Sequence, residues 1–297
     1  MAPKLKFDYL FIDVRANHPG LGSEEIPEVA RLFEYSHLDP AITGQRQMSP
    51  EQVIARMDEA GITHICMLTW SRPGQMIFSN EDVAVYTRAY PDRIFGLAAV
   101  DLHKPVEAVK ELEHYVNQEG FIGLRVVPWL WNLPPSDAHY WPLFVKCIDL
   151  DVPFFTQVGH TAPACPSDVG RPIPHNDSIT LKFPELKIIM GHIGYPWAAE
   201  TAAVAWKHKN CYIDTSAWSP KYYDPVFVTF ANTTGRSKVM FGTNWPQLGW
   251  KACVDNVHDH LLTKGGLRKE NLLPFFGGNA VRLLKLPDNL SNIRSRL

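Results

Sequence analysis

The sequence predicts a (β/α)8 barrel, that is, a TIM barrel, forming a single domain over residues 1–297. Three observations predict this fold. Eight short apolar runs alternate with stretches of helical periodicity. The runs are almost continuously apolar, which is typical of parallel strands buried on both faces. The length of 297 residues fits one barrel of about 250 residues plus insertions.

The predicted strands are all short and recur along the whole chain. They cover residues 7–14, 62–69, 94–100, 121–127, 153–158, 187–192, 211–215 and 238–243. Between them, helices are expected after Ser49 and over residues 105–117, 197–208, 224–231 and 252–262, with a last one over 279–284. Ser49 followed by Pro50 is typical of a helix start, with a capping residue before a proline.

Two insertions are longer than ordinary loops of a barrel. Residues 19–47 follow the first strand and residues 159–176 follow the fifth. Both leave the carboxyl ends of strands, where the active sites of these barrels lie. We therefore expect them to form lids or walls of a pocket.

Composition excludes several classes of function. The formal net charge is -2 and the pI is about 6.6, so nothing favours nucleic acid or an anionic membrane as a partner. The sequence contains no apolar segment near the roughly 20 residues of a membrane span. The N-terminus has no pattern of a signal peptide, and the five cysteines form no CxxC pair. We expect a cytoplasmic protein with a small-molecule substrate.

His192 is the first candidate for catalysis. The apolar run 187–190 ends in Gly191-His192, and Tyr195-Pro196 follows as a turn. Catalytic residues of (β/α)8 barrels come from such strand ends. His192 is therefore predicted to act as an acid/base or a metal ligand. The alternative is a buried histidine bonded to the barrel backbone.

Several phrases resemble the amidohydrolase-related barrels, a group that includes aminocarboxymuconate semialdehyde decarboxylase, resorcylate-type decarboxylases and a pyrone-dicarboxylate lactonase. They follow the family order from the first strand to the eighth, so the resemblance covers nearly the whole chain. The phrases are Phe11-Ile12-Asp13-Val14, Gly123-Leu124-Arg125, Thr156-Gln157-Val158-Gly159-His160, Gly191-His192-Ile193-Gly194, Tyr212-Ile213-Asp214-Thr215-Ser216 and Phe241-Gly242-Thr243-Asn244-Trp245-Pro246. The resemblance implies a hydrolase or decarboxylase that acts on a small carboxylated or aromatic molecule.

The resemblance also implies a metal site, from which this chain departs. Arg15 and Asn17 stand where the first strand usually has two histidines, Gln157 replaces the histidine of strand five, and Asn244 replaces the aspartate of strand eight. Only His192 is kept. Zinc prefers His, Cys and carboxylate donors, and an arginine would repel it. The cofactor is thus either absent or one divalent metal (Zn, Fe or Mn) in a non-standard site, for which the predicted ligands are His18, His160 and His192.

The remaining candidates follow from side-chain chemistry at strand ends. Asp13, His160 and Asn244 join His192 as predicted catalytic residues. Arg15 and Arg125 are predicted to bind a substrate carboxylate, although each could instead pair with Asp13 or Asp214. The other predicted substrate-binding residues are neutral hydrogen-bonding amides or aromatic rings, each of which could also be structural: Asn17, Gln157, Trp70, Trp218 and Trp245.

Three functions stay open on the sequence alone. The first is the hydrolase or decarboxylase with an atypical or absent metal. The second is a catalytically weak subunit that assembles with a related, metal-bearing amidohydrolase chain. The third is an oxidative Fe or Mn enzyme with a rearranged ligand set. A homo-oligomer or hetero-oligomer is expected in each case.

Overall fold

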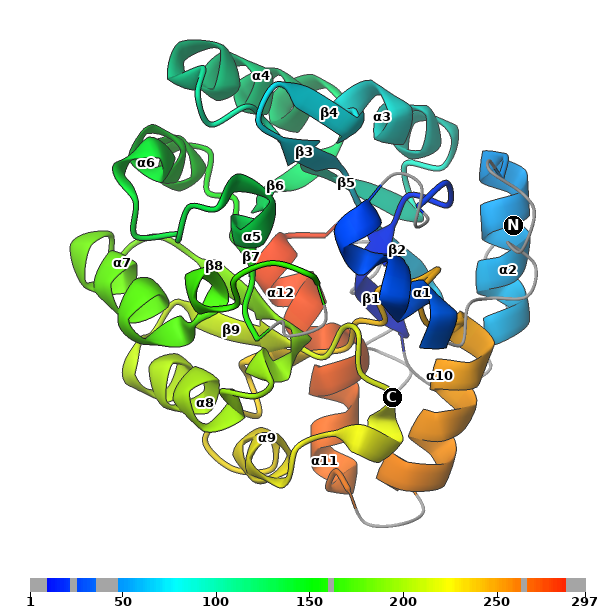
Figure 1. Cartoon of the computed structure of the whole chain (residues 1–297). Helices are drawn as coiled ribbons and strands as arrows, with labels where there is room; N and C mark the ends of the chain where they lie inside the picture. The colour runs from blue at the N-terminus through cyan, green and yellow to red at the C-terminus, as the bar shows by residue number, and fades with distance from the viewer. Residues whose placement is uncertain (1–9, 22–25, 36–47, 160–162, 263–265, 287–297) are drawn as a thin grey trace.

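A computed structural model describes residues 10–21, 26–35, 48–159, 163–262 and 266–286. Eight strands form one sheet in the order β1-β2-β5-β6-β7-β8-β9-β10, and each neighbouring pair is parallel. Figure 1 shows the helices arranged in a ring outside these strands. The predicted TIM-barrel fold is therefore confirmed.

All eight predicted barrel strands are present, with shorter bounds for most of them. They are β1 (Ile12–Asn17), β2 (His64–Leu68), β5 (Ile94–Ala98), β6 (Phe121–Val126), β7 (Phe154–Gln157), β8 (Ile188–Gly191), β9 (Cys211–Asp214) and β10 (Val239–Met240). Their alternate residues separate into two apolar groups. Ile12, Cys66 and Phe155 belong to the group inside the barrel, whereas Phe11 and Ile65 pack toward the helices.

The helices fill the crossovers between strands. They are α1 (Ala30–Tyr35), α2 (Pro50–Ala60), α3 (Asn80–Ala89), α4 (Pro105–Gln118), α5 (Pro128–Trp131), α6 (Trp141–Asp149), α7 (Asp177–Lys182), α8 (Ala198–Lys207), α9 (Pro225–Ala231), α10 (Trp250–Asn256), α11 (Lys269–Leu273) and α12 (Asn279–Leu284). Helix α2 begins as predicted: Ser49 accepts from the Gln52 amide, and Gln52 accepts from the Ser49 amide. No helix in the described part of the chain is long and apolar enough to cross a membrane.

Strand β1 differs from its prediction. It runs on to Asn17, three residues past the predicted end at residue 14, while residues 7–9 lie outside the described chain. All of Ile12–Asn17 is buried, including the polar side chains of Asp13, Arg15 and Asn17. The sequence pattern predicted an earlier end of the strand because these side chains are polar. In the structure they form hydrogen bonds within the protein instead of contacting water.

A small antiparallel hairpin was not predicted. Strand β3 (Trp70–Arg72) follows β2 almost directly and pairs with β4 (Gln75–Phe78) across a turn at Gly74. Gly74 has φ of +72°, a conformation that favours glycine. The hairpin matters because it carries Trp70 to the mouth of the barrel.

The barrel closes through the segment that follows β10. The Val14 amide donates to the Phe241 carbonyl (3.0 Å), the Asn244 amide to the Arg15 carbonyl (2.8 Å) and the Asn17 amide to the Trp245 carbonyl (2.6 Å). These bonds place the end of β1 beside Asn244. The predicted oligomer stays a prediction.

Candidate active site

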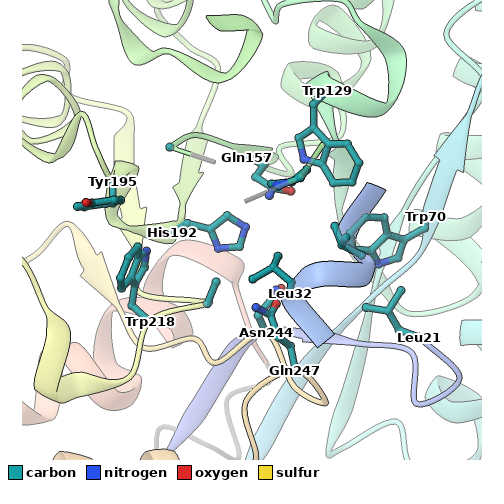
Figure 2. A pocket seen from close by; sticks show the side chains of 14 residues that line it. Leu21, Leu32, Trp70, Trp129, Gln157, His192, Tyr195, Trp218, Asn244 and Gln247 are labelled. Atoms are coloured by element: carbon teal, nitrogen blue, oxygen red, sulfur yellow. Dashed lines mark hydrogen bonds between the residues drawn. The ribbon is translucent and has the colours of Figure 1, made fainter. Parts of the chain in front are cut away.

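A cavity of about 260 Å³ lies at the carboxyl ends of the strands. Both predicted insertions line it, the first through Leu21, Val29 and Leu32 and the second through Gly159 and Pro163. Figure 2 shows side chains from several strand ends turned toward one space. The remaining lining residues are Trp70, Trp129, Gln157, His192, Tyr195, Ala217, Trp218, Asn244 and Gln247.

His192 follows β8 directly and reaches into the cavity from the same side as Tyr195 and Trp218 (Figure 2). Its φ of +68° is unusual for a residue with a side chain and turns the chain sharply after the strand. Nδ1 faces two oxygens of Ser216, the carbonyl at 3.0 Å and Oγ at 2.9 Å. A carbonyl only accepts, so Nδ1 carries a proton and Nε2 is the basic nitrogen of the neutral ring.

Below His192, a chain of polar groups leads into the barrel. Ser216 Oγ and the Ser216 amide both donate to Asp214 Oδ1. The other carboxylate oxygen of Asp214 pairs with Arg15 Nε at 2.8 Å, and both side chains are fully buried. Arg15 Nη2 also donates to the Thr156 carbonyl at 3.2 Å. A connected path of hydrogen bonds therefore runs from Arg15 of β1 through Asp214 and Ser216 to His192.

A second network consists of amides and an indole. Trp70 Nε1 donates to Asn17 Oδ1 (3.0 Å), and Asn17 Nδ2 donates to Asn244 Oδ1 (3.2 Å). Asn244 Nδ2 in turn donates to Gln247 Oε1 (2.6 Å). The network fixes the Trp70 ring and the Asn244 amide at the cavity wall. Gln157 differs from these amides, since its buried Oε1 has no hydrogen-bond partner among the described residues.

Arg125 lies beneath Trp70. Its guanidinium is 3.9 Å from the centre of the Trp70 ring, and Nη1 donates to the Thr69 carbonyl at 3.0 Å. No carboxylate of the described residues forms an ion pair with it. Burial lowers the pKa of the Arg125 guanidinium, and nearby Arg15 lowers it further. It still stays protonated near neutral pH, because the ordinary pKa of arginine exceeds about 12.

Comparison with known proteins identifies the family. The family model described as Amidohydrolase matches residues 71–286, which is more than half of the chain. The chain belongs to the amidohydrolase family.

Relatives of this amidohydrolase include decarboxylases of aromatic acids. It is 26% identical over 263 residues to a gamma-resorcylate decarboxylase of Polaromonas sp., an alignment that covers 70% of this chain and 75% of the relative. An uncharacterized TIM-barrel protein of Bordetella bronchiseptica superposes with a TM-score of 0.77, at 22% identity, over 93% of this chain and 98% of that one. The 5-carboxyvanillate decarboxylase of Novosphingobium aromaticivorans, complexed with manganese and 4-hydroxy-3-methoxy-5-nitrobenzoic acid, superposes with a TM-score of 0.69, at 16% identity, over 96% and 99%.

The donor set of this amidohydrolase does not fit a divalent cation of the usual kind. The Asn17 and Asn244 oxygens already accept from N–H groups, and Arg15 brings a positive charge below His192. Both oxygens of Asp214 are likewise occupied. Within the described ranges, no three His, Cys, Asp or Glu side chains group as a metal site would require. We derive no chemical step through a metal.

Histidine 18 does not join the predicted ligand set. Its ring stacks on Phe78 (4.6 Å between centres), meets Tyr86 edge-on and accepts from the Gly20 amide through Nδ1. Burial lowers its pKa to about 4. His18 is absent from the cavity lining, so the structure does not bring it into the cavity with His192. His160, predicted as ligand and catalytic residue, lies outside the described residues.

The structure brings five of the predicted site residues to the cavity, namely Trp70, Gln157, His192, Trp218 and Asn244. Asn17 supports this group through its hydrogen bonds to Trp70 and Asn244 but does not line the cavity.

Four other predicted site residues do not line the cavity. Arg15 points into the barrel and pairs with Asp214, because an irregularity of β1 between Asp13 and Ala16 interrupts the alternation that begins with Ile12 inside the barrel. Arg125 packs under Trp70 instead of lining the cavity. Trp245 is buried against Trp250, with ring centres 4.2 Å apart.

Asp13 is the fourth, because its carboxylate is structural. It accepts from the Arg15 and Thr243 amides (3.0 Å each), the Trp250 indole (2.8 Å) and the Thr243 hydroxyl (2.5 Å). Burial raises its pKa, while these bonds act in the opposite direction. The four donors tie β1 to the segment after β10 and leave no oxygen directed at the cavity.

Sequence reasoning missed several residues of the site. Ser216 directly contacts His192, and Gln247 ends the amide network. Tyr195 was missed as well; its ring centre lies 4.8 Å from that of the predicted Trp218 at one wall of the cavity. Ser216 could have been found as a hydroxyl two residues after Asp214 at a strand end, but serine is too common in loops for this signal to stand alone.

Proposed function

We propose that the protein is a decarboxylase of a small aromatic carboxylate in which His192 carries the proton and the usual metal site is not used. The observation that carries this proposal is the placement of His192. Its Nδ1 is held by Ser216 while the ring projects into a cavity with aromatic walls. The similarity to a gamma-resorcylate decarboxylase supports the reaction type.

The cavity favours a flat molecule with one ring. Its volume of about 260 Å³ is below the roughly 300–1,000 Å³ of pockets for drug-sized ligands. Trp70 and Trp129 stand on one side and Tyr195 and Trp218 on the other (Figure 2). Aromatic side chains bind a flat ring through large apolar contact and offset stacking.

The reaction follows from the two nitrogens of His192. As an imidazolium, His192 donates the Nε2 proton to the ring carbon that bears the carboxylate. The bond between this carbon and the carboxylate then breaks, its electron pair restores the aromatic ring, and CO2 leaves. His192 is now neutral with the proton on Nδ1, and it regains a proton from solvent. The sum is one carboxylate and one proton consumed, and one arene and one CO2 formed.

Two polar features would orient the substrate. Gln157 Oε1 is a buried acceptor that matches a phenolic hydroxyl, and an electron-donating hydroxyl makes the neighbouring ring carbon easier to protonate. Arg125, buried beneath Trp70 without an ion pair in the described chain, makes this wall electropositive. In a low-dielectric site such a charge favours an anionic substrate without direct contact.

The first test is turnover of a panel of benzoates with zero, one or two hydroxyls, measured in D2O by proton NMR. Wild-type protein should release CO2 and place one deuterium on the carbon that carried the carboxylate. His192→Asn should lower kcat by about 10²–10⁴-fold, as expected for loss of a proton donor.

His103→Asn is the matched control, since His103 is exposed and lies against Trp131 outside the cavity. It should keep wild-type turnover. Turnover that survives in His192→Asn would remove His192 from the chemistry. Activity that vanishes on metal removal and returns with manganese or zinc would overturn the metal-free part of the proposal.

A further inference from the structure

The orientation of His192 depends on which groups of Ser216 face it. The Ser216 carbonyl can only accept from Nδ1 (3.0 Å). The hydroxyl could either donate or accept at 2.9 Å, and its role is decided on its other side. There it faces Asp214 Oδ1, a carboxylate oxygen that only accepts. The hydroxyl hydrogen therefore points to Asp214, and Oγ presents lone pairs to His192.

Arg15 fixes the far end of this path. Its Nε donates to Asp214 Oδ2 at 2.8 Å, and its Nη2 donates to the Thr156 carbonyl at 3.2 Å. The guanidinium passes close under Gly191 and near the Phe155 ring (5.6 Å). Arg15 and Asp214 are fully buried, so water does not compete for these bonds.

We propose that Arg15, Asp214 and Ser216 act as positioning residues that fix the tautomer of His192 and thereby decide which of its nitrogens faces the substrate. Only one assignment of donors and acceptors fits the whole path: Arg15 and Ser216 both donate to Asp214, and His192 Nδ1 donates to Ser216. Arg15 thus supplies a permanent internal cation at a strand end where the family resemblance implies a metal ligand. The catalytic consequence rests on the proposed decarboxylation, whereas the tautomer can be measured without it.

The proposal predicts a shift of the His192 tautomer in Asp214→Asn, a substitution that conserves shape. Arg15 Nε and the Ser216 amide both only donate, and the charged guanidinium is the stronger donor, so the new amide should turn its oxygen toward Arg15. Its NH2 then faces Ser216 Oγ, which becomes an acceptor on that side and donates its hydrogen to His192 Nδ1. The Ser216 carbonyl still accepts from Nδ1 and opposes this change, so the neutral ring should divide its proton between Nδ1 and Nε2 instead of keeping it on Nδ1, the arrangement that the proposed reaction needs.

The experiment uses full-length protein labelled with 15N in its histidines. In wild type at a pH where the ring is neutral, the protonated-nitrogen signal should belong to Nδ1, with His192→Asn identifying the resonances. In Asp214→Asn part of this signal should move to Nε2. On an accepted benzoate, kcat should fall by up to about 10⁴-fold, the loss known for the same change beside the histidine of a serine protease, with KM within about twofold.

Asp13→Asn is the control for damage to the fold. It makes the same change in another buried carboxylate, one that contacts neither His192 nor Ser216. It should keep the wild-type tautomer. An Nδ1 proton fully retained in folded Asp214→Asn, or an Nε2 proton already present in wild type, would overturn the proposal; the second measurement needs no variant to fold.

The two proposals fail separately. A tautomer that shifts as expected in Asp214→Asn, in a protein that decarboxylates no benzoate, supports the positioning path and rejects the proposed function. Decarboxylation by wild type together with an unchanged tautomer in Asp214→Asn rejects the path and supports the function.

Discussion

Gly191 lets the Arg15 guanidinium pass beneath the end of β8. A Cβ placed on Gly191 would lie 2.8 Å from both Cζ and Nη2 of Arg15. The guanidinium cannot retreat without breaking its pair with Asp214. The backbone of Gly191 is ordinary (φ −79°, ψ 160°), so any cost of a side chain here comes from this contact and not from conformation.

Gly191→Ala should therefore destabilise the fold by about 1–3 kcal/mol, as overpacking in a core does. It should also lower turnover, because Arg15 and the path to His192 shift together. Gly278→Ala is the matched control, since its nearest atom lies at 3.3 Å and no buried charge is involved. Thermal unfolding measures the stability of both variants. Equal midpoints of thermal unfolding in the two variants would show that the Arg15 side chain moves aside without loss of stability.

For single residues, a place at the end of a strand was easier to predict from the sequence than the direction in which the side chain points. His192, Gln157 and Asn244 were predictable as residues of the cavity wall because they lie at, or up to a few residues after, the ends of barrel strands. Arg15 and Arg125 were not, because strand periodicity alone does not say whether a polar residue meets water or a buried partner. That choice depends on Asp214 and Trp70, which are distant in sequence and adjacent only in the fold.

At the scale of elements, the segment after β1 is held over the cavity by contacts to two other loops. Glu28, in the short helix η1 (Pro27–Val29), pairs with Arg72 of the hairpin through two bonds of 3.2 and 3.3 Å. The Ala164 amide donates to the Glu28 carbonyl at 2.8 Å. Val29 and Leu32, which line the cavity, belong to this same segment.

Glu28→Gln should loosen this segment without touching the chemistry. The pair is partly exposed, and such pairs contribute about 0–1 kcal/mol. We expect KM to rise by about two- to fivefold with kcat nearly unchanged. Glu113→Gln, which breaks a comparable pair with Lys146 away from the cavity, is the control and should leave KM unchanged. A fall in kcat with constant KM would contradict a role in holding the substrate.

The elements themselves were largely predictable because barrel strands are uniformly apolar and their crossovers are amphipathic. The β3–β4 hairpin escaped because Trp70, Ser71 and Arg72 show no run of apolar residues. Ser71 and Trp70 are buried through hydrogen bonds to Val100 and Asn17, which a local pattern cannot reveal.

At the scale of the whole molecule, buried neutral histidines link the fold to pH. Burial lowers the pKa of His64 to about 3, with Arg93 as a smaller cause, and that of His18 to about 4. The half-buried His175 is shifted in the same direction. In the unfolded chain these rings titrate near pH 6.5. The folded state therefore binds fewer protons than the unfolded state between about pH 4 and 6.5.

Stability should accordingly fall as the pH is lowered through this range, because protons favour the state that binds more of them. Between pH 6.5 and 5.5, His18 and His64 together should cost about 2 kcal/mol, which lowers Tm by about 3 °C for a chain of this length. Asp13, whose pKa is raised by burial, acts in the opposite direction, because the folded state binds its proton more tightly than the unfolded state does. Differential scanning fluorimetry from pH 7.5 to 5.0 measures the slope, and His64→Gln should reduce it by about half. A Tm that is constant over this range would mean that both rings take up protons in the folded protein.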